Sequence, residues 1–209
     1  MLWNDEELGE WMKNKKISRK GEIYMRNIEK TKKMIINALL LGIGAILHQV
    51  TPALGLPMQP DFALIMLFII MMINKNNYKT CLISGMITGI FTAMTTKFPG
   101  GQLPNMIDKL VTVNLMFILI MIINKMKLIK NISDNKKKVI ESLIIFPIGT
   151  LVSGLTFLLS ASILVGLPAG FTSLFVVVVI PAIAINSVVG FFLFRIIKSS
   201  MKAISLKEN

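Results

Sequence analysis

The feature that most constrains this chain is a series of long apolar runs that are almost free of charge. Apolar residues recur in them with neither a period of two nor one of three and a half, so helices formed there are apolar on every face. A bilayer core about 30 Å thick requires roughly 20 residues of helix, and only helices and closed barrels satisfy their backbones inside it. We therefore expect an all-α membrane protein, in agreement with the mean hydropathy of +0.68.

The apolar runs predict a bundle of six transmembrane helices. Their predicted ranges are 34–50, 56–73, 80–94, 106–123, 142–164 and 171–197. Pro181 lies near the middle of the last range, where a proline is expected to kink the helix. The chain is thus divided into a charged segment (1–33), a six-helix membrane domain (34–197) and a basic tail (198–209).

The basic residues are segregated with respect to these helices. The chain has 23 Lys and Arg residues and a formal charge of +12, and only Lys97 and Lys109 fall on the side opposite to both termini. This distribution is the positive-inside pattern, which places both termini of a multi-pass inner-membrane protein in the cytoplasm. The positive charge is then topological, and we do not expect nucleic acid as a partner.

Two features of the chain each have two interpretations. Residues 1–33 mix charge with scattered tryptophan and aliphatic residues, which fits either a helix at the lipid interface or a loosely ordered tail. Small residues at helical spacing allow close helix approach, either within the bundle or to a partner. These residues are Ala38, Gly42 and Ala45 in the first predicted helix, and Gly85, Gly89 and Ala93 in the third.

Polar residues gather on the predicted outer side. The first helix ends in His48 and Gln49, and Asp61 ends the loop that follows. The second outer stretch contributes Thr96, Lys97, Phe98, Gly100, Gly101, Gln102, Asn105, Asp108 and Lys109. We expect a binding site for a small solute among these residues.

A polar stripe begins the fourth predicted helix. Asn105, Asp108, Lys109 and Thr112 fall at i, i+3, i+4 and i+7, which is one helical face. Charges this close to hydrocarbon usually pair or line a wet cavity, so we expect this face to point inward and to be functional. In the alternative interpretation, Asp108 and Lys109 lie at the interface and pair only with neighbours.

The outer side offers complementary charges for a zwitterion. Three predicted helices begin there and present positive dipole ends that suit a carboxylate. Asp61 and Asp108 add negative charge that suits an ammonium group. The Pro-Gly-Gly run at 99–101 brings backbone N–H groups close to a ligand or forms only a tight turn, and Phe98 offers an aromatic wall or a lipid anchor.

Enzyme chemistry has little support in the sequence. The chain contains no phosphate-binding loop, zinc-protease motif or nucleophile elbow, and we expect neither a cofactor nor a metal. His48 at a helix end suits either a local cap or a substrate contact. An intramembrane enzyme that uses His48 with Asp61 or Asp108 as acid and base remains an alternative.

Three stretches carry a resemblance to a known family. They are Ala38-Leu-Leu-Leu-Gly-Ile-Gly-Ala-Ile-Leu-His48, the Pro60-Asp61 pair, and Phe98-Pro-Gly-Gly-Gln-Leu-Pro-Asn105 continuing to Asp108-Lys109. In these residues the chain resembles the bacterial tryptophan transporter (TrpP) family, which is similar to the substrate-binding S components of energy-coupling factor (ECF) transporters.

The resemblance implies uptake of tryptophan or a similar aromatic solute at a site near the outer face. The carboxylate is then expected at Lys109, Lys97 or the helix N-termini, the ammonium at Asp61 or Asp108, and the indole N–H at Gln102 or Asn105. Similarity to S components implies a separate membrane subunit with ATPases, docked on Ala38, Gly42 and Ala45. A stand-alone carrier driven by an ion gradient is the alternative within transport.

Overall fold

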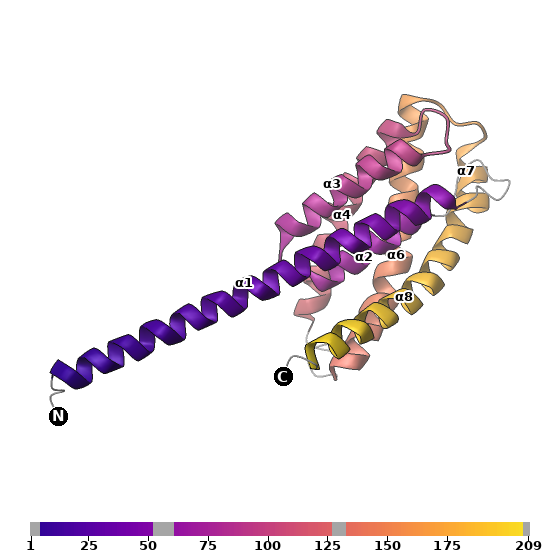
Figure 1. Cartoon of the computed structure of the whole chain (residues 1–209). Helices are drawn as coiled ribbons and strands as arrows, with labels where there is room; N and C mark the ends of the chain where they lie inside the picture. Colours follow the sequence, from indigo (N-terminus) through magenta and orange to yellow (C-terminus); the bar gives the residue numbers. More distant parts are fainter. Residues whose placement is uncertain (1–4, 52–60, 127–132, 207–209) are drawn as a thin grey trace. The chain divides into compact units, whose positions relative to one another are not determined.

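The computed structural model describes residues 5–51, 61–126 and 133–206, and every regular element in these ranges is helical. The all-α prediction is therefore confirmed for this part of the chain (Figure 1). The elements are α1 (Asp5–Val50), α2 (Phe62–Ile73), α3 (Tyr78–Thr95), α4 (Gln102–Lys125), α6 (Asp134–Leu164), α7 (Phe171–Leu174), the π-helical turn η1 (Phe175–Val179) and α8 (Ile180–Leu206).

Four helical stretches are long and apolar enough to cross a membrane. They are Ile23–Val50, Gln102–Lys125, Lys136–Leu164 and Phe171–Met201. The predicted second helix is represented by α2, a shorter apolar helix, and its expected first residues, 56–60, lie outside the described ranges. Helices of this length and composition belong to a protein that passes through a membrane several times.

The chain divides into two compact units, residues 1–39 and 40–209. Within the first unit, residues 5–39 are helical, so the charged segment is a helix where it is described. Ile23, Tyr24 and Met25 are exposed on that helix. No break in α1 occurs at the predicted boundary between residues 33 and 34.

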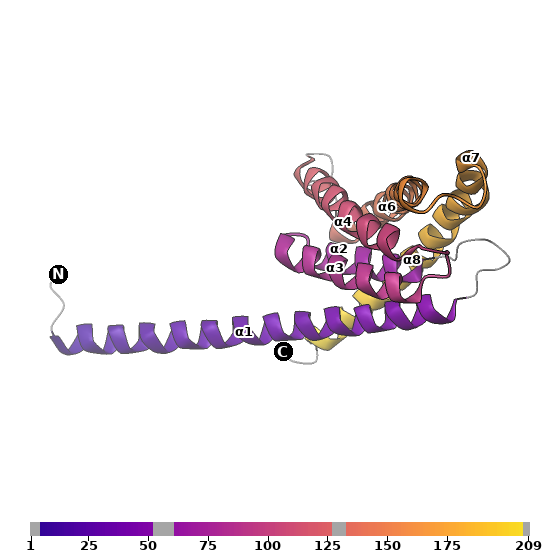
Figure 2. The same cartoon turned by 90° about the horizontal axis from the view of Figure 1, so that it is seen from above.

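The second unit is a bundle built around α2. Residues 63–72 of α2 are all buried, and α2 contacts α3, α4, α6 and α8 (Figure 2). Its twelve residues include no polar side chain, and a helix that is apolar all round belongs in the interior of a bundle. Around it, α4 packs on α3 and on α6, and α6 packs on α8.

Glycines permit several of these close contacts. A Cβ built on Gly85 of α3 would lie 2.9 Å from Val113 of α4, and one built on Gly149 of α6 would lie 2.3 Å from the Phe68 ring. The Phe68 ring in turn meets the Phe146 ring edge to face, with centroids 6.3 Å apart. The small residues of α3 thus serve packing inside the bundle, which is the first of the two predicted interpretations.

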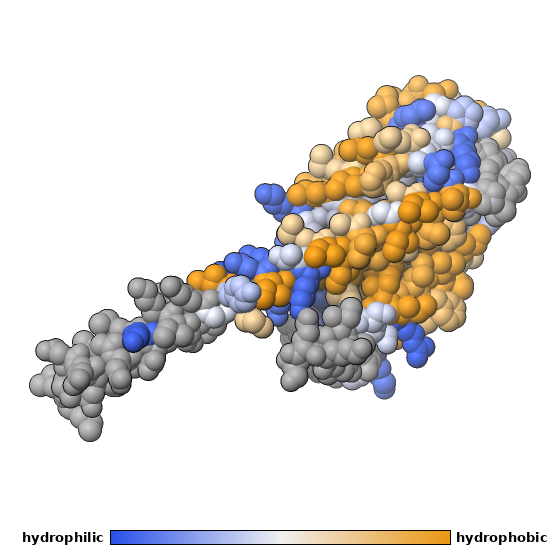
Figure 3. Space-filling model, in the orientation of Figure 1, coloured by the Kyte–Doolittle hydropathy of each residue, from blue (hydrophilic) through white to orange (hydrophobic). Residues whose placement is uncertain are grey.

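The outer surface of the bundle is apolar, as a lipid solvent requires. Large aliphatic and aromatic side chains are exposed along it, and hydrophilic residues gather toward its ends (Figure 3). Examples are Leu103, Ile118, Ile163, Val188 and Phe192.

Near Pro181, where the sequence predicts a kink, the helix departs from regular α-helical geometry. The five residues before Ile180 form a π-helical turn, in which the Ile180 N–H donates to the Phe175 carbonyl. Because proline has no N–H, a local widening of the helix is a common way to accommodate it.

Candidate binding pocket

One pocket of the second unit brings together polar side chains from the α1 end, the start of α2, the α3–α4 loop, α4, α6 and the last long helical stretch. Its lining combines charge with an apolar wall. The residues are His48, Asp61, Leu64, Thr96, Lys97, Phe98, Asn105, Asp108, Lys109, Thr150, Ser153, Gly154, Phe157, Val178, Val179, Ala182 and Asn186.

A lysine between two carboxylates forms the centre of the pocket. Lys109 Nζ lies 2.6 Å from Asp61 Oδ2 and also binds Asp108 Oδ2. Lys109 and Asp108 are each only 1% exposed. A buried charge needs such partners, because an unpaired ion in a low-dielectric interior is strongly unfavourable.

Asp108 is held by several donors besides Lys109. Thr112 Oγ1 donates to Asp108 Oδ1 at 2.9 Å, and Ser153 Oγ donates to Asp108 Oδ2 at 2.9 Å. The Ser153 contact joins α6 to α4. The carboxylate of Asp108 is therefore occupied by bonds within the protein, which makes it a positioning group for Lys109.

Among the described residues, Asp61 has fewer hydrogen-bond partners than Asp108, and its side chain is more exposed. Asp61 Oδ1 accepts the Leu64 N–H at 2.9 Å, which caps the N-terminus of α2. The side chain of Asp61 is 18% exposed, against 1% for Asp108. His48 Nε2 lies 3.9 Å from Asp61 Oδ1, and His48 Nδ1 forms a 2.7 Å hydrogen bond with Thr95 Oγ1.

A second lysine reaches the pocket from the α3–α4 loop. Lys97 is exposed, and its Nζ donates to the Thr51 carbonyl. Beside it, Thr96 Oγ1 accepts the Phe98 N–H at 3.3 Å. With His48 neutral, two carboxylates and two lysines give the pocket lining a formal charge of zero.

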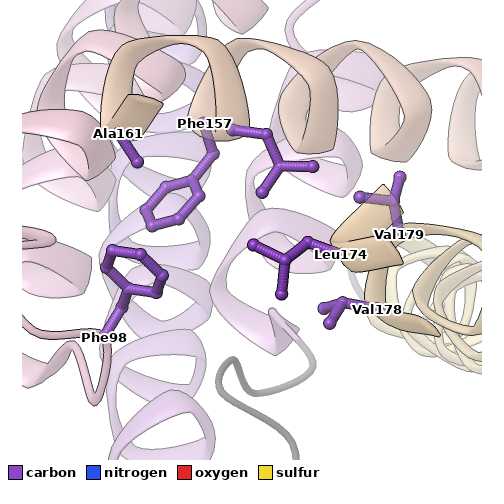
Figure 4. Packing of buried hydrophobic residues seen from close by; sticks show 7 residues of the cluster. Phe98, Phe157, Ala161, Leu174, Val178 and Val179 are labelled. Carbon is purple, nitrogen blue, oxygen red and sulfur yellow. The ribbon is translucent and has the colours of Figure 1, made fainter. Parts of the chain in front are cut away.

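An apolar cluster forms the adjoining wall (Figure 4). Its buried members are Phe98, Phe157, Leu158, Ala161, Leu174, Val178 and Val179. The rings of Phe98 and Phe157 meet edge to face with centroids 5.4 Å apart. Phe98 is thus packed inside the bundle, where it forms part of an aromatic wall and does not act as a lipid anchor.

The Pro-Gly-Gly run shapes the loop that carries Lys97 and Phe98. Gly100 has φ +70°, and a Cβ there would lie 2.2 Å from Val165 of the α6–α7 loop. A Cβ on Gly101 would lie 2.8 Å from Thr96 Oγ1. Both glycines are therefore required by the turn and its packing, and neither lines the pocket.

Eight of the predicted site residues line this pocket. They are His48, Asp61, Thr96, Lys97, Phe98, Asn105, Asp108 and Lys109. Five others do not line it: Gln49 and Gln102 are exposed, Gly100 and Gly101 build the turn, and Thr112 supports Asp108. The polar stripe of α4 does point inward, since Asn105, Asp108, Lys109 and Thr112 are all buried. Pro60 lies outside the described residues.

Sequence reasoning did not identify the contribution of the last two long helices. Thr150, Ser153, Gly154 and Phe157 lie on one face of α6 at i, i+3, i+4 and i+7, and Asn186 lies in α8. The feature of the sequence that could have identified them is the presence of hydroxyl and amide side chains inside apolar helices, where polar residues are usually functional.

The pocket is narrow in this structure. Its accessible space is about 70 Å³, which is room for a few water molecules. Within the described part of the chain, no group of three or more His, Cys, Asp or Glu side chains could hold a metal ion.

Comparison with known proteins places the chain in a family. The model of the tryptophan transporter TrpP family matches residues 30–202. A probable tryptophan transport protein of Clostridium perfringens is 54% identical over 176 residues, which are 84% of this chain and 96% of that protein. A protein of the same description from Bacillus subtilis is 37% identical over 179 residues, which are 86% of this chain and 98% of the relative. No solved structure matches the chain. The chain therefore belongs to the TrpP family of tryptophan transporters.

Proposed function

We propose that the chain takes up tryptophan across the bacterial inner membrane and that the pocket around Asp61 and Lys109 is its binding site. The observation that carries this proposal is the pairing of charged groups of both signs with an aromatic and aliphatic wall in one pocket. A zwitterionic amino acid with an indole side chain has the complementary chemistry.

The proposed topology has six membrane-crossing helices and both termini in the cytoplasm. Its support is the segregation of Lys and Arg, since the pocket end of the bundle contains only Lys97 and Lys109 among the predicted outer residues. In this arrangement α2 and α3 add to the four long apolar stretches. Residues 1–33, which precede the membrane domain in the sequence, and residues 198–209, which follow it, are then both cytoplasmic.

Asp61 is the proposed partner of the substrate ammonium. Its side chain is more exposed than that of Asp108, and among the described residues its oxygens receive fewer donors. An ammonium placed beside it adds a charge-assisted hydrogen bond without breaking the N-cap of α2.

Lys97 is the proposed partner of the substrate carboxylate. Lys109 pairs with two aspartates, whereas Lys97 is an exposed pocket residue whose ammonium, within the described part of the chain, donates to the Thr51 carbonyl. A carboxylate is a stronger acceptor for an ammonium than a neutral carbonyl.

Entry of the indole side chain requires the Phe98–Phe157 contact to open. Phe98 is carried by the short α3–α4 loop, whereas Phe157 lies within the long helix α6. The loop is the element that can move with less disturbance of packing.

Equilibrium binding of radiolabelled tryptophan to the purified chain tests the site. Asp61→Asn retains an acceptor for the α2 N-cap and removes the negative charge, so it is expected to weaken binding about tenfold or more. Asn114→Ala is the control, because Asn114 lies on α4 outside the pocket and bonds with Tyr78. Equal affinity of wild type and Asp61→Asn would reject the site.

The proposal has two forms, which differ in the energy source that drives tryptophan uptake. In the first, the chain is an S-component-like subunit that works with a separate membrane subunit and ATPases, docked along Ala38, Gly42 and Ala45. Ala38 is exposed, and a Cβ on Gly42 would meet no atom within 4 Å. In the second, the chain is a carrier driven by an ion gradient.

Two measurements separate these forms. Co-purification of ATPase-bearing subunits that is lost in Gly42→Leu supports the first form. Uptake of tryptophan by the isolated chain in liposomes under an ion gradient supports the second. Recovery of unchanged tryptophan after the uptake experiment favours transport over the intramembrane enzyme that His48 and Asp61 would otherwise allow.

A further inference from the structure

Asn186 lines the pocket and has a side-chain acceptor without a hydrogen-bond partner. The residue is 1% exposed, and its Oδ1 is the one buried side-chain polar atom of the described residues that has no hydrogen-bond partner. Buried polar groups almost always have hydrogen-bond partners. A buried group without one has lost its hydrogen bonds to water and gained none in return. Such an atom in a pocket wall points to a donor supplied by a ligand.

The surroundings of Asn186 hold its amide in place. Asn186 Nδ2 donates to Thr150 Oγ1 of α6 at 3.3 Å, which leaves Oδ1 as the free end of the amide. Val178, Val179 and Ala182 precede it on the same side of the helix at i−8, i−7 and i−4, and all three line the pocket. Asn186 thus places an amide beside the apolar pocket residues of its own helix.

Thr150 lies about one helical turn further from the end of α6 than Ser153, which bonds to Asp108. Asn186 is fifteen residues after the start of α7 and Thr150 is fourteen before the end of α6, which is about 20 Å of helix in each case. Asn105 lies only about one turn from the start of α4. The α3–α4 loop meets the α6–α7 loop where Gly100 packs against Val165.

We infer that Asn186 Oδ1 accepts the ring N–H of bound tryptophan and thereby selects an indole over aromatic rings that have no donor. This inference rests on the proposed function of the pocket. It differs from the expectation based on sequence, which assigned the ring N–H to Gln102 or Asn105. Gln102 is exposed and does not line the pocket. Asn105 lines the pocket near the rim, but its side-chain oxygen is not among the buried polar atoms of the described residues that have no partner, whereas Asn186 Oδ1 is.

The experiment compares tryptophan with its benzothienyl analogue, in which sulfur replaces the ring N–H at nearly the same size. Binding of both is measured on the purified full chain and on Asn186→Leu, which keeps the side-chain shape and removes the amide. The wild type is expected to bind tryptophan about tenfold more tightly than the analogue. In Asn186→Leu the preference is expected to disappear, with the analogue bound at least as well as by the wild type.

Retained binding of the analogue shows that Asn186→Leu is folded. Ser187→Ala is the matched control on α8, because the Ser187 hydroxyl donates to the Ile183 carbonyl of its own helix and the residue does not line the pocket. It should keep the tenfold preference.

Three results would overturn the inference: equal affinity of the wild type for both ligands, a preference that survives in Asn186→Leu, or loss of binding of both ligands by the same factor in that variant. Failure of the wild type to bind either ligand would instead reject the proposed function itself.

Discussion

Lys109 of α4 and Asp61 at the N-cap of α2 form an ion pair of 2.6 Å in the interior of the bundle. Asp61 also caps α2 through the Leu64 N–H, and Lys109 also binds Asp108, which Ser153 ties to α6. One chain of polar contacts therefore joins three helices beside the pocket. The same groups that would meet a substrate also fix the helices that form its walls.

Replacing Lys109 should destabilise the bundle. Lys109→Met removes the cation from between two carboxylates and leaves both without their buried partner, which is expected to lower the free energy of unfolding by about 3 to 5 kcal/mol. Thermal unfolding of the detergent-purified protein measures the change. Lys125→Met, at the exposed end of α4, is the control and should unfold at the wild-type temperature. Identical melting of both variants would show that the ion pair adds little.

Lys97 should distinguish tryptophan from tryptamine, which has no carboxylate. The wild type is expected to bind tryptophan at least tenfold more tightly, because the Lys97 ammonium gains a charged acceptor. Lys97→Met should bind the two ligands about equally in the same competition assay. Lys79→Met, on the exposed opposite end of the bundle, should retain the preference. A preference that persists without Lys97 would assign the carboxylate elsewhere.

Gly149 should not tolerate a methyl group. A Cβ at this position would lie 2.3 Å from the buried Phe68 ring, so Gly149→Ala is expected to destabilise the bundle by about 1 to 3 kcal/mol. Gly42→Ala is the matched control in another helix, where a Cβ meets no atom within 4 Å, and alanine there favours helix formation. Gly149→Ala should therefore melt at a lower temperature than Gly42→Ala. An equal change in the melting temperature of both variants would contradict the close packing of Gly149 against Phe68.

Cysteine labelling should report the proposed topology. Cys81 is buried, and its replacement by alanine provides a background without reactive thiols. In intact cells, a membrane-impermeant maleimide should label Ala169→Cys, in the exposed α6–α7 loop, and should leave Asn76→Cys, in the exposed α2–α3 loop, unlabelled until lysis. Labelling of Asn76→Cys but not of Ala169→Cys in intact cells would show that the orientation is the opposite of the one proposed.

The sequence alone determined the features that arise from local spacing. Apolar runs long enough for a bilayer identified an all-helical membrane protein, since the match between helix length and lipid thickness needs no tertiary information. The four-residue stripe of α4 was correctly expected to point inward, because 3.6-residue periodicity places Asn105 and Thr112 on one face and charges avoid lipid.

Only the tertiary structure decided which distant groups meet. Lys109 and Asp61 are far apart along the chain, as are Ser153 and Asp108, and no local pattern encodes such pairs. The same holds for Asn186, whose significance lies in the absence of a donor near its buried oxygen within the described bundle. The periodicity of a helix specifies which side chains share a face, whereas the partners of that face depend on how helices pack against one another.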